Sequence, residues 1–175
     1  MNLTTRRLTE PQDSLFAELW QLYESSFPWE ERHDTDWQQR AMSDEAFRCM
    51  RVEQDGQAVA LLFYWVRPGY VYLEHLAVHP SRRGQGLGTA VLELLPSLPV
   101  VLEIEPVCDD ATSRRLRFYE HAGYRLLPCA HTQPPYHPGL PPLPLSLLVR
   151  GDFAEELLAD FRAWQPSIGA GANTF

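Results

Sequence analysis

The 175-residue chain contains no lysine, so all 15 of its basic residues are arginines. Any site that depends on a lysine side chain is therefore excluded, including a Walker P-loop and a lysine Schiff base. The 23 acidic residues outnumber the basic ones, and the formal net charge is −8. This balance argues against general binding to nucleic acid or to anionic membrane surfaces.

Cysteine is also scarce, and long apolar runs are missing. Cys49, Cys108 and Cys129 are odd in number and never stand in CxxC spacing. This pattern favours reduced thiols in a cytoplasm over disulfides or a metal site. No apolar run approaches the roughly 18 residues of a membrane-spanning helix, and the first residues lack the apolar segment of a signal peptide. We expect a soluble, cytoplasmic protein.

The length and the hydrophobic content favour one folded domain. Hydrophobic residues make up 45% of the chain, a value typical of globular proteins. The chain is long enough for one well-packed core and too short for two comfortable ones. We expect a single domain over residues 1–165, followed by a flexible tail over residues 166–175.

Hydrophobic periodicity predicts a mixed α/β layer fold in which helices and strands alternate in the second half. Strands are expected at Leu3–Leu8, Phe47–Gln54, Ala58–Val66, Tyr70–Val78, Val100–Glu105, Tyr124–Cys129 and the stretch LPLSLLV. Helices are expected at Pro11–Phe27, Asp34–Phe47, Ala111–Ala122 and Asp152–Trp164, and along the apolar face Leu87, Val91, Leu94 and Leu95. The proline-rich segment PCAHTQPPYHPGLPPLP is expected to form a stiff loop.

The stretch HPSRRGQGLGTAVLELL places three glycines directly before an apolar helical pattern. A loop without side chains between a strand and a helix exposes amide N–H groups beside a helix N-terminus, which is typical of a pyrophosphate site. Arg82 and Arg83 add positive charge beside this loop. The spacing differs from a GxGxxG dinucleotide fingerprint, and a simple glycine-rich turn is the alternative.

These residues resemble a known family. LEHLAVHPSRRGQGLG is similar to the pyrophosphate-binding signature of the GCN5-related N-acetyltransferases (GNATs), in which Arg/Gln-x-x-Gly-x-Gly/Ala cradles coenzyme A. Arg83, Gly86 and Gly88 fall on that pattern. The resemblance covers about Tyr70–Leu127, and the order of elements extends it over the rest of the chain.

The resemblance implies an α/β (α+β) GNAT fold and a CoA site. The fold is a mixed, mostly antiparallel sheet of about seven strands, splayed between the fourth and fifth strands and flanked by helices, here with an added C-terminal helix. Acetyl-CoA is the implied co-substrate, no metal is implied, and pantetheine is expected to hydrogen-bond the main chain at Leu76 and Val78. The implied CoA-binding residues are Leu76, Ala77, Val78, Arg83, Gly84, Gln85, Gly86, Leu87, Gly88 and Thr89.

Acetyl transfer to an amine needs an acid for the departing thiolate and a base for the amine. Tyr119, in RFYEHAGY, matches the GNAT tyrosine that serves as general acid; a core role is the alternative. Many GNATs carry an asparagine seven residues earlier, where this chain has Thr112. CoA contacts from that turn are therefore not implied.

Three carboxylates are candidates for the base. Glu103 and Glu105 alternate along an otherwise apolar strand, where burial tends to raise a carboxyl pKa. Glu103 matches the glutamate that some GNATs use on the fifth strand, and Glu74 lies on the neighbouring strand. A structural hydrogen-bonding role is the alternative for all three. His75 points to the face opposite Glu74 and is interpreted as a core histidine.

The acceptor is expected over the splayed strands. The candidates are Phe27 and Trp29, which stand near Trp37 and several acidic residues, and Tyr136, which is held between prolines. Aromatic and acidic side chains suit a cationic amine, whereas an acidic surface with inward-packed aromatics is the alternative. We expect a small-molecule or peptide amine as acceptor, and a monomer or homodimer.

Two classes of function remain open at this point, and within the enzyme class a longer acyl-CoA is open as an alternative donor. The first is an acetyl-CoA-dependent N-acetyltransferase that works by direct transfer with general acid/base catalysis. The second is a non-catalytic acyl-CoA-binding sensor or interaction domain of the same fold. A binding module would not need Tyr119 or the paired glutamates, so these residues favour the enzyme.

Overall fold

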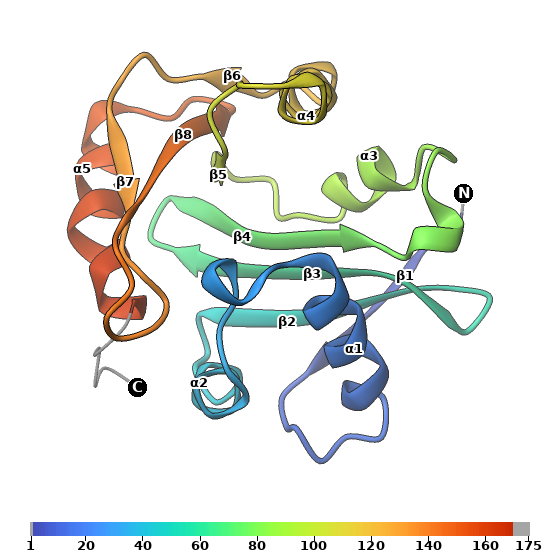
Figure 1. Ribbon diagram of the computed structural model, residues 1–175. Coiled ribbons are helices and arrows are strands. Elements are labelled where there is room, and N and C mark those ends of the chain that lie inside the picture. The colour runs from blue at the N-terminus through green and yellow to red at the C-terminus, as the bar shows by residue number, and fades with distance from the viewer. Residues whose placement is uncertain (1, 170–175) are drawn as a thin grey trace. The chain divides into compact units, whose positions relative to one another are not determined.

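The computed structural model describes residues 2–169, in which strands and helices occur in mixed order (Figure 1). Its eight described strands run in the order β1-β2-β3-β4-β5-β8-β6, with β7 paired to β8. The described chain divides into two units, residues 2–66 with 73–96 and residues 67–72 with 97–169. Strand β4, Tyr70–Val78, contributes residues to both units and has β5 as a parallel neighbour. The predicted mixed, mostly antiparallel sheet is confirmed, while its predicted splay stays a prediction.

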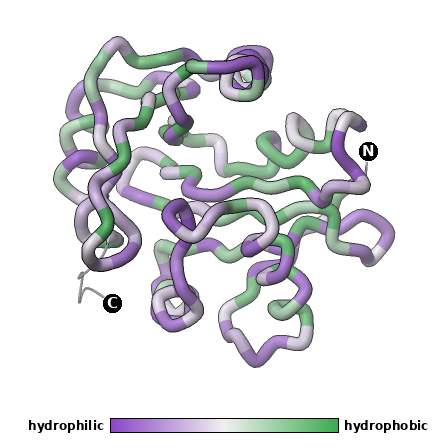
Figure 2. Tube along the Cα trace, viewed as in Figure 1, coloured by the Kyte–Doolittle hydropathy of each residue, from purple (hydrophilic) through white to green (hydrophobic). Residues whose placement is uncertain are grey.

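Antiparallel strands form the base of the first unit. Strand β2, Phe47–Gln54, pairs with β1, Thr4–Leu8, and with β3, Gln57–Arg67. The turn between β2 and β3 places Asp55 and Gly56 at φ values of 53° and 77°, the two positive φ values of a type I′ hairpin. This turn is hydrophilic in Figure 2. A tight two-residue turn sets the register and so decides which side chains face the core.

Helices cover both faces of these strands. They are α1 (Phe16–Ser26), η1 (Trp29–Glu31), α2 (Thr35–Met42), η2 (Pro80–Arg82) and α3 (Leu87–Leu92). Figure 1 shows α2 and α3 on opposite sides of the strands. Consistent with this, every residue from 59 to 65 in β3 is buried, an unbroken apolar run rather than an alternating one.

The second unit is centred on β8, Leu143–Arg150. It pairs antiparallel with β5, β6 and β7, which span Val100–Ile104, Arg125–Leu126 and His131–Gln133. Its helices are α4 (Asp110–His121), α5 (Glu155–Trp164) and η3 (Gln165–Ile168). Phe161 of α5 is fully buried, and its ring centroid lies 5.1 Å from that of Tyr72. Through this contact, α5 packs against the first residues of β4.

The structure differs from the sequence predictions in several places. The predicted strand Tyr124–Cys129 is only the two residues of β6, Arg125–Leu126. Strand β7 occurs within the proline-rich segment, because residues 131–133 pair with β8 although prolines flank them. Helix α3 ends at Leu92, before the predicted Leu94 and Leu95. At the other end of the chain, η3 continues the fold past residue 165, with Ile168 buried. Residues 170–175 of the predicted tail lie outside the described residues, and the single domain stays a prediction.

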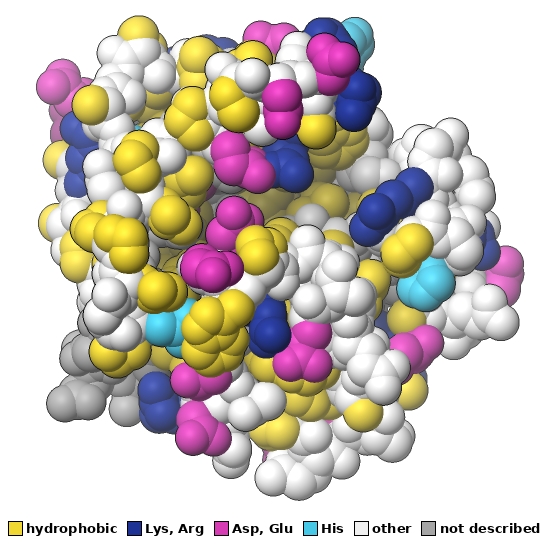
Figure 3. Space-filling model, in the orientation of Figure 1, with side chains coloured by type: hydrophobic (Ala, Val, Ile, Leu, Met, Phe, Trp, Pro, Cys, Tyr) yellow, Lys and Arg dark blue, Asp and Glu magenta, His cyan; other side chains and the backbone are white. Residues whose placement is uncertain are grey.

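Acidic and arginine side chains are interspersed on the face drawn in Figure 3. Several arginines pair locally with acids, as Arg51 does with Glu18 at 2.8 Å and with Glu53 at 2.9 Å. No helix among residues 2–169 is both long enough and apolar enough to cross a membrane.

Candidate functional site

The glycine loop lies between η2 and α3, and two of its glycines have a left-handed backbone. Gly84 and Gly86 both have φ of 75°, a left-handed conformation that residues with a Cβ atom rarely adopt. A Cβ atom at either position would meet no heavy atom within 4 Å, so the loop is open on that side. The amides of residues 84–89 donate no hydrogen bond within the described part of the chain. A run of such amides is suited to hold a phosphate group.

The two arginines before the loop have different partners. Arg83 Nε donates to the carbonyl oxygen of Val78 at 3.1 Å, which ties the side chain to the end of β4. The other guanidinium nitrogens of Arg83 make no hydrogen bond to residues 2–169. Arg82 is instead held by the side chain of Gln54 in β2. Both arginines therefore keep guanidinium nitrogens without a partner in residues 2–169, and Arg83 is the more exposed of the two.

The predicted CoA-binding residues form one continuous path along the end of β4, the loop and the start of α3. Ala77 and Leu87 are buried, whereas Leu76 and Val78 are half-buried and Gly88 and Thr89 lie in α3. Their roles stay predictions, but the structure places all ten in the first unit.

Glu74 in β4 is held by two donors. Its Oε1 atom lies 2.7 Å from His33 Nε2, and its Oε2 atom accepts from Trp65 Nε1 at 2.9 Å. The side chains of Glu74 and His33 are each only 1% exposed. Burial raises the pKa of Glu74, but the charge and hydrogen bond of His33, the charge of His75 and the bond from Trp65 together bring it below its ordinary value. For Glu74 these partners therefore outweigh the effect of burial.

Glu103 in β5 lies at the centre of a larger network. Its Oε1 atom is bonded to His131 Nε2 and, at 2.7 Å, to Gln165 Nε2. Its Oε2 atom accepts from Tyr72 Oη at 2.6 Å and from Gln133 Nε2 at 2.6 Å. The side chain is 4% exposed. Four hydrogen bonds use the acceptor capacity of an ionised carboxylate almost completely.

Glu105 differs from the other two carboxylates because it follows β5 and pairs with Arg115 of α4 with its side chain 35% exposed. His75 is a buried core histidine, as expected, with Nε2 at 2.9 Å from the carbonyl oxygen of Glu31. The structure therefore groups Glu103 and Glu105 on one unit and Glu74 on the other.

Tyr119 in α4 has a hydroxyl that makes no hydrogen bond within residues 2–169. Burial raises its pKa to about 12, with Arg115 acting in the opposite direction. The phenol is therefore protonated at neutral pH and has a proton to donate. Its ring centroid lies 5.5 Å from that of Tyr124.

Thr112, seven residues before Tyr119, closes the N-terminus of α4. Its amide donates to Asp109 Oδ1 at 2.7 Å, and its hydroxyl oxygen accepts from the Asp109 amide at 3.1 Å. This reciprocal pair is a capping box. The side chain that replaces the asparagine of many GNATs is therefore engaged in capping the helix.

The predicted acceptor residues occupy different surroundings. Phe27 is half-buried with its ring centroid 4.7 Å from that of His75, and Trp29 is 47% exposed with the Arg32 guanidinium over its ring. Trp37 is a core residue, and Asp34 caps α2 by accepting from the Trp37 amide. Tyr136 is buried, and its hydroxyl oxygen accepts from Gln133 Nε2 at 3.2 Å. Only Trp29 is an exposed aromatic here.

Sequence reasoning missed the polar partners of the two buried glutamates. Buried carboxylates require donors, so partners for Glu74 and Glu103 could have been expected in general terms. Their identity depends on contacts between residues far apart in the chain, such as Glu103 and Gln165, which no local pattern reveals. No group of three or more His, Cys, Asp or Glu side chains suited to a metal ion occurs within residues 2–169.

Two comparisons of the sequence with known proteins both give acetyltransferases. The family described as Acetyltransferase (GNAT) family matches residues 14–124. The chain is 37% identical over 60 residues to YjbC of Bacillus subtilis (strain 168), whose name assigns it to the acetyltransferases. That match covers 32% of this chain and 31% of YjbC, so it spans less than a third of the relative's length.

Solved structures share the fold. A GNAT-family chain from Bacteroides thetaiotaomicron superposes with a TM-score of 0.84 at 26% identity, covering 92% of this chain and 95% of that chain. An aminoglycoside 6'-N-acetyltransferase solved with coenzyme A superposes with a TM-score of 0.61 at 15% identity, covering 84% and 96%. A B. subtilis acetyltransferase solved with CoA gives a TM-score of 0.58 at 15% identity over 85% and 98%.

Proposed function

Because the chain belongs to the acetyltransferase (GNAT) family, we propose that it transfers an acetyl group from acetyl-CoA to a primary amine of a small molecule or peptide. The observation that carries the proposal is the glycine loop. Its left-handed Gly84 and Gly86, its unused amides and the spare donors of Arg83 together fit a pyrophosphate. The CoA complexes of structural neighbours support the same ligand.

The proposed chemistry is direct transfer. The amine nitrogen attacks the thioester carbonyl carbon, a C–N bond forms, and the C–S bond breaks. Tyr119 donates its phenolic proton to the departing thiolate, a role supported by its unengaged hydroxyl and raised pKa. The amine proton goes to a base, after which the tyrosine is reprotonated from solvent.

For the base, we propose Glu103 first and Glu74 and Glu105 as alternatives. Glu103 is ionised in the proposal, because four groups face its two oxygens and a carboxylate accepts from all four. Direct proton uptake requires one of these four donors to move away from the carboxylate. Glu74 also has both oxygens engaged, and Glu105 is held by Arg115. The pH–rate profiles of the three glutamine variants distinguish them.

The acceptor residues in the proposal are Phe27, Trp29 and Tyr136. The exposed Trp29 ring offers an aromatic face to an ammonium group. We also propose a cytoplasmic location, since the free cysteines Cys49, Cys108 and Cys129 suit a reducing compartment.

The test is a thiol-release assay with acetyl-CoA and a panel of amines, which includes amino acids, polyamines, aminoglycosides and short peptides with a free N-terminus. We expect saturable CoA release with at least one amine, and mass spectrometry of the product should show one added acetyl group. Tight CoA binding without turnover on any amine would favour the sensor domain instead. Absence of CoA binding would overturn both.

A further inference from the structure

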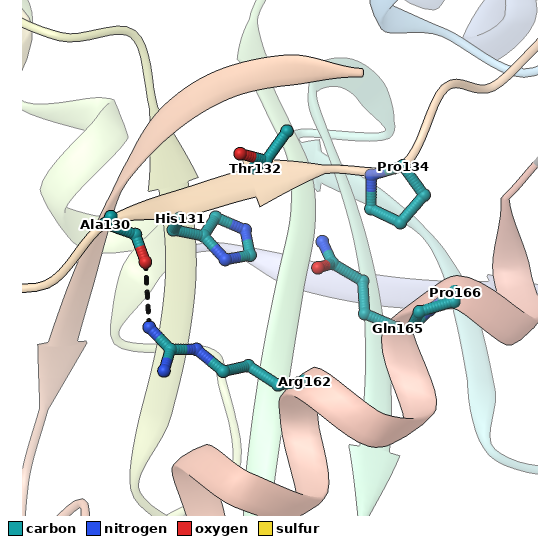
Figure 4. Close-up of a pocket in the computed structure, with 7 residues that line it drawn as sticks. All are labelled: Ala130, His131, Thr132, Pro134, Arg162, Gln165 and Pro166. Atoms are coloured by element: carbon teal, nitrogen blue, oxygen red, sulfur yellow. Dashed lines mark hydrogen bonds between the residues drawn. The ribbon is translucent and has the colours of Figure 1, made fainter.

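A small cavity of about 210 Å³ lies within the second unit. Its lining residues do not include those of the glycine loop. One wall comes from residues 130–134, which include β7, and the other from the end of α5 and the start of η3 (Figure 4). At roughly 30 Å³ per water-sized heavy atom, it has room for about seven heavy atoms. A ligand of this cavity is therefore much smaller than CoA.

Two polar side chains of the cavity are fixed by the same carboxylate oxygen. His131 Nε2 and Gln165 Nε2 both bond to Oε1 of Glu103. Because the other Glu103 oxygen already has two donors, the carboxylate only accepts, and the Nε2 nitrogen of His131 carries the hydrogen. The orientation of both side chains is thereby set before any ligand arrives.

This fixed orientation leaves two polar atoms for a ligand, of which Nδ1 of His131 accepts when the imidazole is neutral. The Nδ1 atom of His131 makes no hydrogen bond within residues 2–169, although the imidazole side chain is only 4% exposed. The carbonyl oxygen of Gln165, a residue that is 3% exposed, accepts no hydrogen bond there either. The unused atoms of these two buried side chains open into the cavity, where a water molecule or a ligand can bond them.

Arg162 supplies the positive charge of the same cavity. One of its terminal nitrogens donates to the carbonyl oxygen of Ala130 at 2.9 Å, and its other nitrogens have no partner within the described chain. Figure 4 shows this bond at one end of the cavity. The cavity thus presents the free donors of Arg162 beside His131 and Gln165. The buried Glu103 carboxylate is bonded to the other side of both of these side chains.

We propose that this cavity binds a small carboxylic acid that carries a hydroxyl or amino group next to its carboxylate, such as an α-hydroxy or α-amino acid. The carboxylate pairs with Arg162. A neighbouring ammonium group donates to both His131 Nδ1 and the Gln165 carbonyl oxygen, whereas a neighbouring hydroxyl donates its one hydrogen to one of them. A singly charged anion fits better than phosphate, because one arginine faces the ligand while Glu103 lies behind the acceptors. Glu103 is then a positioning residue for this site, and the assignment does not depend on CoA binding.

The experiment measures ligand binding to the full chain without CoA by calorimetry. The probes are L-lactate, L-serine, acetate, ethanolamine and inorganic phosphate. We expect L-lactate or L-serine to bind at a single site, acetate at least tenfold more weakly, and ethanolamine and phosphate not at all. Arg162→Gln should weaken binding at least tenfold. Arg117→Gln, which changes an exposed arginine of α4, is the matched control and should leave the affinity unchanged.

Nitrogen NMR of the histidine side chains gives an independent readout. The His131 signal, identified by its loss in His131→Gln, should have the hydrogen on Nε2, and the bound ligand should shift Nδ1 more than Nε2. Equal binding by the Arg162→Gln and Arg117→Gln variants, preference for phosphate or ethanolamine, or an absence of binding by all five probes would overturn the proposal. Calorimetry with CoA on the same Arg162→Gln protein tests the proposed function separately.

Discussion

His33 and Glu74 form a buried pair in which the imidazole Nε2 atom lies 2.7 Å from the carboxylate Oε1 atom. The His33 ring also stacks on Trp37, with ring planes 3° apart, and Trp65 holds the second carboxylate oxygen. The pair therefore joins α2, β3 and β4 with the segment before α2. Because the pKa of Glu74 is lowered in the folded protein, the pair links the stability of the fold to pH.

The first prediction concerns that link. A lowered carboxyl pKa contributes stability that is fully present above the unfolded pKa, about 4.3, and is lost as the pH falls through the folded value. Glu74→Gln should therefore lower the free energy of unfolding by about 1–3 kcal/mol at pH 7. The difference from the unsubstituted protein should shrink below about pH 4. Urea unfolding at a series of pH values measures both.

Glu105→Gln is the matched control for Glu74, because its ion pair with Arg115 is partly exposed. We expect a change within about 0.5 kcal/mol at pH 7. A Glu74→Gln protein as stable as the Glu105→Gln protein would show that the buried pair contributes little.

The second prediction tests the glycine loop. Gly86→Asp should weaken CoA binding at least tenfold, about 1.4 kcal/mol, since it adds a negative charge and a side chain where the loop has left-handed backbone. Calorimetric titration with CoA measures the effect. Gly139→Asp is the matched control, because Gly139 has φ of 84° and open space around it but lies in the proline-rich segment. If both variants bind CoA like the unsubstituted chain, the loop is not the CoA site.

The third prediction concerns Tyr119. Tyr119→Phe should reduce kcat about 10²–10⁴-fold and leave the CoA dissociation constant nearly unchanged, because only the donated proton is removed. Since burial raises the pKa of this tyrosine to about 12, its deprotonation should produce no alkaline limb of the rate profile below about pH 11. Tyr124→Phe removes a hydroxyl from the adjacent ring and serves as control. Full activity of Tyr119→Phe would assign this residue to packing alone.

The fourth prediction separates the three carboxylates. Glu103→Gln should flatten the acidic limb of the pH–rate profile, because an amide does not take up the proton of the amine. The same change at Glu105 or Glu74 should alter the profile less. Tyr72→Phe, which removes one donor from Glu103 and keeps the carboxylate, should retain the limb.

Glu103→Gln should also destabilise the fold by about 1–3 kcal/mol, since an amide offers one acceptor oxygen where four donors converge. Thermal unfolding of the variant keeps this effect apart from the kinetic one. Loss of the acidic limb in Glu74→Gln alone would place the base on β4. An unchanged limb in all three variants would exclude these carboxylates as the base.

Local patterns predict most strands because their own residues encode them, although only Arg125–Leu126 of the predicted strand Tyr124–Cys129 is extended in the sheet. Phe47–Gln54 and Tyr70–Val78 are predicted and observed with the same bounds. Strand β7 was not predicted, since prolines surround its three residues and only pairing with β8 makes them extended. Helix α3 is shorter than its apolar pattern predicts, because Leu95 lies in a bend after the helix and its side chain is buried there.

The candidate site was predictable only where it is continuous in the chain. The glycine loop needs residues 83–88 and nothing else, so the sequence motif contains its geometry. The surroundings of Glu74 depend on His33, which lies 41 residues away. Such contacts lower the pKa of Glu74 against the effect of burial, and they depend on how the segment before α2 packs on β4.

The network around Glu103 has a consequence for how the second unit folds. Its partners lie 31, 28, 30 and 62 residues away in sequence, on β4, β7 and η3. Contacts of such separation are favourable only after the intervening loops have closed, which costs conformational entropy first. We therefore expect these hydrogen bonds to form after the folding transition state. Removing the Tyr72 hydroxyl should then speed unfolding while leaving the refolding rate almost unchanged.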